Sequence, residues 1–69
     1  MKKNQRIVVK WLTESDLNFI DNIHELEAGF DESETIPDEV SEAYEELSYT
    51  EKIEVIKKSA SNILKMVTA

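Results

Sequence analysis

Cysteine is absent from this 69-residue chain, and histidine, proline and glycine occur once each. Disulfides and thiolate metal sites are therefore excluded, and a single histidine cannot build a multi-histidine zinc site. The scarcity of glycine and proline, together with ample Ile, Leu and Val, favours a folded chain over a disordered one. A chain this short forms one small domain, residues 1–69, and buries only about 60% of its unfolded surface, so its core is thin.

Long hydrophobic runs and catalytic motifs are also missing. The apolar run Ile7 to Leu12 is interrupted by Lys10, and no stretch approaches the roughly 20 apolar residues that a membrane helix needs. We therefore expect a soluble, cytoplasmic protein that does not engage a membrane. The chain has no glycine-rich phosphate loop, nucleophile elbow or metal cluster, so we expect no enzyme activity, no cofactor and no bound metal.

Charge of one sign is missing from half of the chain. The net charge is −7, and residues 14–46 hold thirteen acidic residues without one Lys or Arg. A surface that is merely solvated usually mixes both signs, because like charges one helical turn apart are mildly destabilising. The missing bases therefore indicate a surface that attracts a cationic partner. The alternative is that these acids only keep the outer side of a helix in water.

The first apolar segment has the alternation of a strand. Ile7, Val9 and Trp11 would point to one side of a strand over residues 5–12, and this segment is rich in β-branched residues. A helical first turn is the alternative. The sequence thus predicts a mainly α protein with one short N-terminal β-strand followed by three helices.

Helix signals recur over residues 14–28, 37–47 and 51–67. Pro37 suits the first turn of the second helix, and Ser48 with Glu51 has the spacing of a capping box before the third. In that third helix the predicted core stripe excludes Val55 and Met66, and it contains Ile53, Ile56, Ala60, Ile63, Leu64 and Val67.

A lone strand leaves its backbone hydrogen-bonding groups unpaired, so we expect a homodimer that pairs the two strands. Strand followed by helix resembles the layout of the ribbon-helix-helix DNA-binding proteins, over residues 5–29. The resemblance implies a dimeric regulator or antitoxin in which Arg6, Val8 and Lys10 read bases in the major groove. Acidic residues at the start of the next helix oppose this function, because they would face DNA phosphates. Nucleic acid is therefore not the expected partner.

The expected function is that of a small acidic binding protein. It would act as an inhibitor or modulator that occupies a basic surface of a partner protein, for instance by imitating nucleic-acid phosphates. By analogy, phage and plasmid accessory factors are often proteins of this kind. Tyr49 is the candidate interface aromatic. A structural subunit of an oligomer is the third alternative. The candidate partner-binding residues are Glu34, Asp38, Glu39, Glu42, Glu45 and Glu46.

Overall fold

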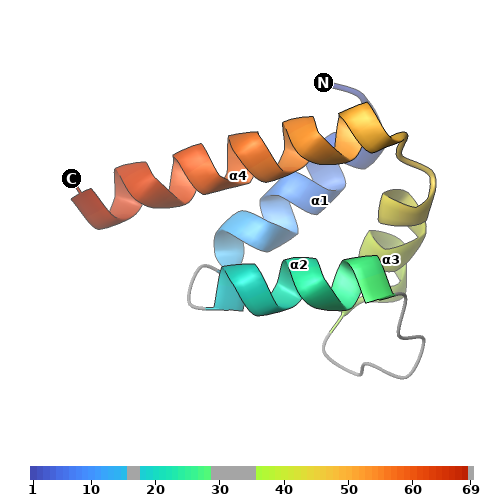
Figure 1. The fold of residues 1–69 in the computed structure, drawn as a ribbon, viewed down its shortest axis with the longest axis horizontal. Helices are drawn as coiled ribbons and strands as arrows, with labels where there is room; N and C mark the ends of the chain where they lie inside the picture. The colour runs from blue at the N-terminus through green and yellow to red at the C-terminus, as the bar shows by residue number, and fades with distance from the viewer. Residues whose placement is uncertain (16–17, 29–35, 69) are drawn as a thin grey trace.

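The computed structural model describes residues 1–15, 18–28 and 36–68, and every regular element in these ranges is an α-helix. Helix α1 packs against the other three, most extensively against α4 and α3. Figure 1 shows α2 and α4 running in opposite directions on the near side of α1, with α3 at one end. The helices are α1 (Lys3–Glu14), α2 (Phe19–Ala28), α3 (Asp38–Glu45) and α4 (Tyr49–Thr68).

The predicted strand over residues 5–12 is wrong, because this segment lies inside α1. Its buried residues are Gln5, Val8, Val9 and Leu12, which recur every three or four positions as the helical period requires. A helix pairs its backbone groups internally, whereas a single strand does not. Packing of this side against α3 and α4 outweighs the β-propensity of the valines.

Loss of the strand also removes the expected dimer contact through it, since the described residues contain no strand at all. The mainly α class is confirmed. So is the small helical character of the protein. Among the described residues, no helix is both long enough and apolar enough to cross a membrane.

Helix ends follow the sequence signals in part. Ser48 Oγ accepts a hydrogen bond from the Glu51 backbone N–H at 3.2 Å, and Glu51 Oε1 accepts one from the Ser48 N–H at 2.9 Å. This completes the predicted capping box and starts α4 at Tyr49, two residues before the predicted start at residue 51. The sequence predicts Pro37 inside the first turn of a helix over residues 37–47, whereas it is the N-cap residue directly before α3, which ends at Glu45. The predicted helix start at residue 14 is wrong, because α1 continues to Glu14 and α2 begins at Phe19.

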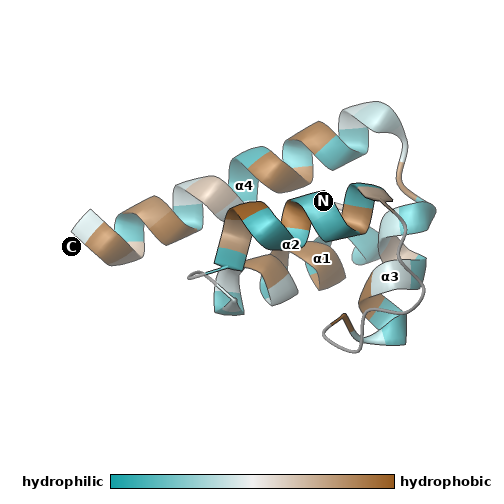
Figure 2. Cartoon of the chain, turned by 60° about the horizontal axis from the view of Figure 1, so that its bottom comes forward, coloured by the Kyte–Doolittle hydropathy of each residue, from teal (hydrophilic) through white to brown (hydrophobic). Residues whose placement is uncertain are grey.

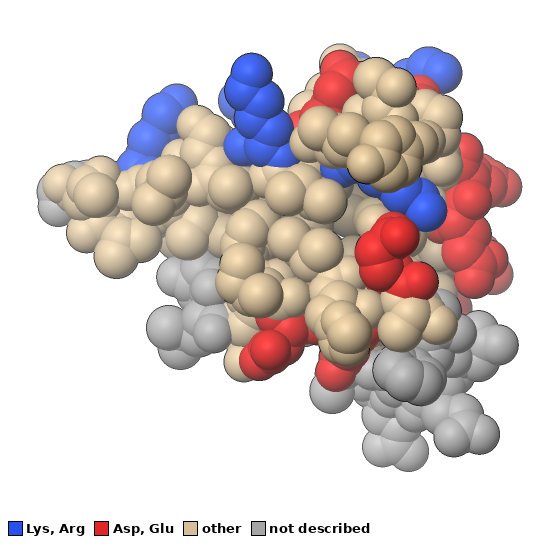
Figure 3. All heavy atoms as spheres, in the orientation of Figure 1, with Lys and Arg blue, Asp and Glu red and all other residues tan. Residues whose placement is uncertain are grey.

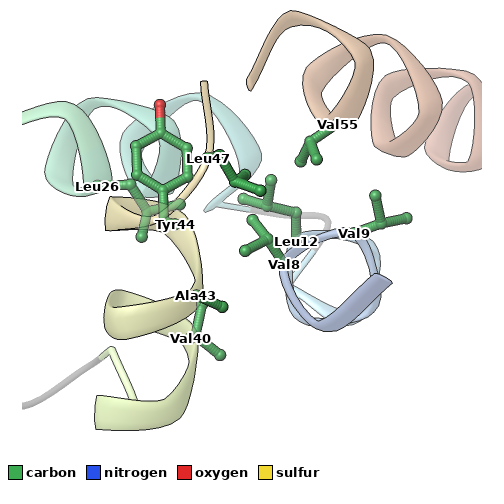
Figure 4. Packing of buried hydrophobic residues seen from close by; sticks show 9 residues of the cluster. All are labelled: Val8, Val9, Leu12, Leu26, Val40, Ala43, Tyr44, Leu47 and Val55. Atoms are coloured by element: carbon green, nitrogen blue, oxygen red, sulfur yellow. The ribbon is translucent and has the colours of Figure 1, made fainter. Parts of the chain in front are cut away.

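The core lies where α1, α3 and α4 meet. Figure 4 shows Val8 and Leu12 of α1 gathered with Leu47 and with Val55 of α4. Leu12, Val8 and Val55 are fully buried, and Tyr44 of α3 is 3% exposed. The complete cluster is Val8, Val9, Leu12, Leu26, Val40, Ala43, Tyr44, Leu47 and Val55.

The inward side of α4 differs from the predicted one. Val55 and Ser59 are fully buried, and the Ser59 hydroxyl donates to the Val55 carbonyl oxygen at 2.7 Å, so burying it leaves no unpaired donor. In contrast, Leu64 and Val67 of the predicted core stripe are 62% and 71% exposed. Only the position of α1 decides which side of α4 is covered. Figure 2 shows hydrophobic residues recurring along α4 even where it extends beyond the other helices.

Candidate functional site

Five carboxylates form one side of α3, which we call the acidic face: Asp38, Glu39, Glu42, Glu45 and Glu46. All five residues are exposed. The opposite side of the helix is buried through Val40, Ala43 and Tyr44, and at about 100° per residue the acids occupy the remaining arc. Figure 3 shows the resulting concentration of acidic atoms at the end of the molecule where α3 lies.

Most of the acidic face has no compensating charge within the described part of the chain. The ion pairs Lys2–Glu51 at 2.7 Å and Lys52–Glu27 at 3.4 Å do not include an acid of α3. Glu46 Oε2 accepts a hydrogen bond from Asn4 Nδ2 at 2.7 Å, which ties this end of α3 to α1. The other four carboxylates therefore face solvent with their charge available to a partner.

Two further candidate residues, Glu34 and Tyr49, are not part of the acidic face. Glu34 lies outside the described residues, so its position relative to α3 stays untested. Tyr49 begins α4 and is 80% exposed, which is the exposure that an interface aromatic needs. Its role as a binding residue also stays a prediction.

A polar cluster around Tyr44 joins α2, α3 and α4. The Tyr44 hydroxyl donates a hydrogen bond to Glu27 Oε2, and Lys52 Nζ lies 4.7 Å from the centre of the Tyr44 ring. The bond from Tyr44, helped by Lys52, lowers the pKa of Glu27. Burial, followed by the Glu27 contact, raises the pKa of Tyr44. Since Lys52 is engaged with Glu27, the cluster does not neutralise the acidic face.

A second ion pair, Lys2–Glu51, fixes the same starting turn of α4 to the residue that precedes α1. The hydrogen bond from Lys2 and the backbone N–H of Ser48 lower the pKa of Glu51 to about 2. The same contact with Glu51 raises the pKa of Lys2. Glu51 therefore serves the helix cap and the docking of the α1 start, and it is not part of a candidate binding surface.

The ribbon-helix-helix resemblance requires Arg6, Val8 and Lys10 to lie exposed on one side of a strand, and they do not. Val8 is fully buried and cannot read bases, whereas Arg6 and Lys10 are exposed on α1. These two cations instead share a groove of about 360 Å³ with Lys58 of α4. A neighbouring hollow also contains Lys57 and Lys58. The groove is lined by Met1, Arg6, Val9, Lys10, Thr13, Glu14, Lys58 and Asn62.

Sequence reasoning missed this basic groove because its residues are far apart in the chain. The available signal was the i, i+4 spacing of Arg6 and Lys10, which places both side chains on one side of the helix if the segment is helical. The partnership with Lys58 depends on how α4 packs on α1.

The described residues contain no group of three His, Asp or Glu placed to hold a metal ion. The chain matches no protein-family model and has no significant match among curated proteins or solved structures.

Proposed function

We propose that this chain is a cytoplasmic binding protein whose acidic face covers a basic surface of a partner protein, as an inhibitor or modulator. One observation carries the proposal: Asp38, Glu39, Glu42 and Glu45 lie together on α3 without an ion pair from the described residues. All eight basic residues belong to α1, its leading residues or α4. The acidic face therefore projects its charge outward.

Such a surface acts mainly through long-range attraction. Complementary charge speeds association and selects partners, and its effect falls as salt screens it over roughly 10 Å at 0.1 M. A row of carboxylates can also occupy sites that bind nucleic-acid phosphates, which is one way to inhibit a basic protein. We therefore expect binding that weakens with salt and depends on the acidic face.

The test uses a charge-reversed variant and a matched control. Glu42→Lys with Glu45→Lys reverses the centre of the acidic face, and it spares the Asn4 contact of Glu46. Glu14→Lys with Glu54→Lys changes the net charge equally at exposed positions of α1 and α4. Each tagged protein is used to capture partners from native lysate at low salt, with far-UV circular dichroism confirming the helical fold.

The proposal requires that a basic protein be retained by the wild type and the control and lost by the α3 variant. Equal retention by all three proteins would refute it. A third variant, Lys10→Glu, separates the DNA-binding alternative: loss of duplex DNA binding in this variant alone would assign the function to the basic groove instead.

A further inference from the structure

An uncharged face spans α4 and the start of α2, and no described element covers it. Ile20 of α2 is 74% exposed, and Ile53, Leu64 and Val67 of α4 are 49%, 62% and 71% exposed. Singly exposed apolar residues are normal, but a contiguous set marks an interaction surface. Figure 3 shows the surface between the middle of α4 and the start of α2 without Lys, Arg, Asp or Glu atoms, whereas charged atoms lie between the two helices nearer the start of α4.

The spacing along α4 is that of a helix with two packing sides. Val55 and Ser59 face α1, as their complete burial shows. At about 100° per residue, a second apolar stripe, partly buried and partly exposed, is centred about 120° from Val55. Its positions are separated alternately by three and four residues, which is the repeat of a helix that packs along another helix. These positions are Ile53, Ile56, Ala60, Ile63 and Val67.

The two long edges of this face carry opposite charges. Glu27 pairs with Lys52, so the Glu27 side of α2 is directed to α4. Asp21 and Glu25 are then about 120° and 160° away around α2, toward its outer edge. On α4, Lys57 lies beside the stripe and on the side away from α2, because it is about 140° from Lys52. The outer edge of α4 is therefore basic and that of α2 acidic.

We propose that a second copy of this chain covers the uncharged face, related by a two-fold axis that runs along α4. This axis places the basic α4 edge of each copy against the acidic α2 edge of the other. It also packs α4 against the other copy's α2 in antiparallel fashion, since α2 and α4 run in opposite directions (Figure 1). An axis across the helices would instead oppose the two Lys57 edges.

The size of the face fits a small dimer interface. The stripe from Ile53 to Val67 is about 21 Å long, and two packed helices are about 20 Å wide, so the flat footprint is on the order of 400 Å² per copy. The smallest specific interfaces bury roughly 600 Å² of accessible surface per partner. The accessible surface of a face is larger than its flat footprint, so the footprint of this face is compatible with such an interface. We therefore expect a dimer that dissociates at micromolar concentration. This dimer is independent of the acidic face.

The mass in solution tests the proposal. Light scattering after gel filtration, between roughly 1 and 100 µM, should show wild-type protein approaching twice its 8.0 kDa chain mass. Leu64→Asp should raise the dissociation constant about 100-fold, because a two-fold interface loses this side chain twice. Met66→Asp is the matched control: Met66 is 56% exposed but lies about 160° from Leu64, and its variant should dimerise normally.

A monomeric wild type at the highest concentration would overturn the proposal, as would Leu64→Asp protein that associates like the wild type. The orientation has its own test. Lys57→Glu and Asp21→Lys should each weaken the dimer, and together they should restore it. Failure of the combined variant to recover association, with circular dichroism unchanged, would overturn the axis along α4.

Discussion

The hydrogen bond from Tyr44 to Glu27 offers a direct test of how α2 is held to α3. Tyr44→Phe removes the hydroxyl and keeps the ring. The ring is buried, so its packing against the core and its contact with Lys52 Nζ, 4.7 Å from the ring centre, stay in place. Any change in the free energy of unfolding then reports the lost bond.

The expected loss of stability is modest because one partner of the hydrogen bond, Glu27, is exposed to water. A hydrogen bond to a charged group contributes about 1.5–3 kcal/mol. The Glu27 side chain is 57% exposed, so water replaces the lost donor, and we expect the loss to be about 1–1.5 kcal/mol. In a domain of this size, such a loss lowers the melting temperature by about 4–12 °C.

The effect should also depend on pH at both ends of the range. The pKa of Glu27 is lowered by folding, so its contribution is present above the unfolded glutamate pKa and is lost as pH falls through the folded pKa. The pKa of Tyr44 is raised, so its contribution is complete below the ordinary tyrosine pKa of about 10 and is lost as pH rises above it. The difference between wild type and variant should therefore be largest near neutral pH.

Urea unfolding followed by circular dichroism measures this difference at several pH values. Tyr49→Phe is the matched control, because Tyr49 is 80% exposed and should lose almost nothing. If Tyr44→Phe costs no more than Tyr49→Phe, or if its cost is the same near pH 3 as at pH 7, the assigned hydrogen bond does not stabilise the fold.

Two further predictions concern α4. Val55→Ala should lower the free energy of unfolding in urea by about 2 kcal/mol, because it opens a cavity at a fully buried position. Ile53→Ala, at a 49% exposed position, should lower it by less than about 1 kcal/mol. The reverse order would mean that the stripe predicted from sequence is the buried one. Folding lowers the pKa of Glu51 to about 2 through Lys2, so its contribution is present above the unfolded pKa and is lost as pH falls toward 2. Glu51→Gln should flatten the acid branch of the stability curve, while Glu54→Gln at an exposed position of the same helix should leave it unchanged.

Signals that act within one turn of the chain were readable in advance. The capping box at Ser48 and Glu51, the start of α3 after Pro37 and the acidic side of α3 all depend on neighbours three or four residues apart. Such contacts form in any conformation that contains the helix. The run of acids without bases was likewise visible, and its exposure on α3 follows from the burial of Val40 and Tyr44.

Features that depend on distant segments were not readable. Residues 5–12 fit a strand or a helix locally, and the choice was made by α3 and α4, which cover Val8 and Leu12. Likewise, α4 has two apolar sides, and only the packing of α1 selects Val55 for the core.

The local sequence determined the helical segments of α3 and α4, the cap of α4 and the separation of charge along the chain, because these rest on interactions across a few residues. Tertiary packing alone decided the helical state of α1, the meeting of Arg6 and Lys10 with Lys58, and the bond between Glu27 and Tyr44. The physical reason is that burial is a property of contacts between elements. A stripe of apolar residues predicts that a helix side can be covered, and the neighbouring helix determines whether it is.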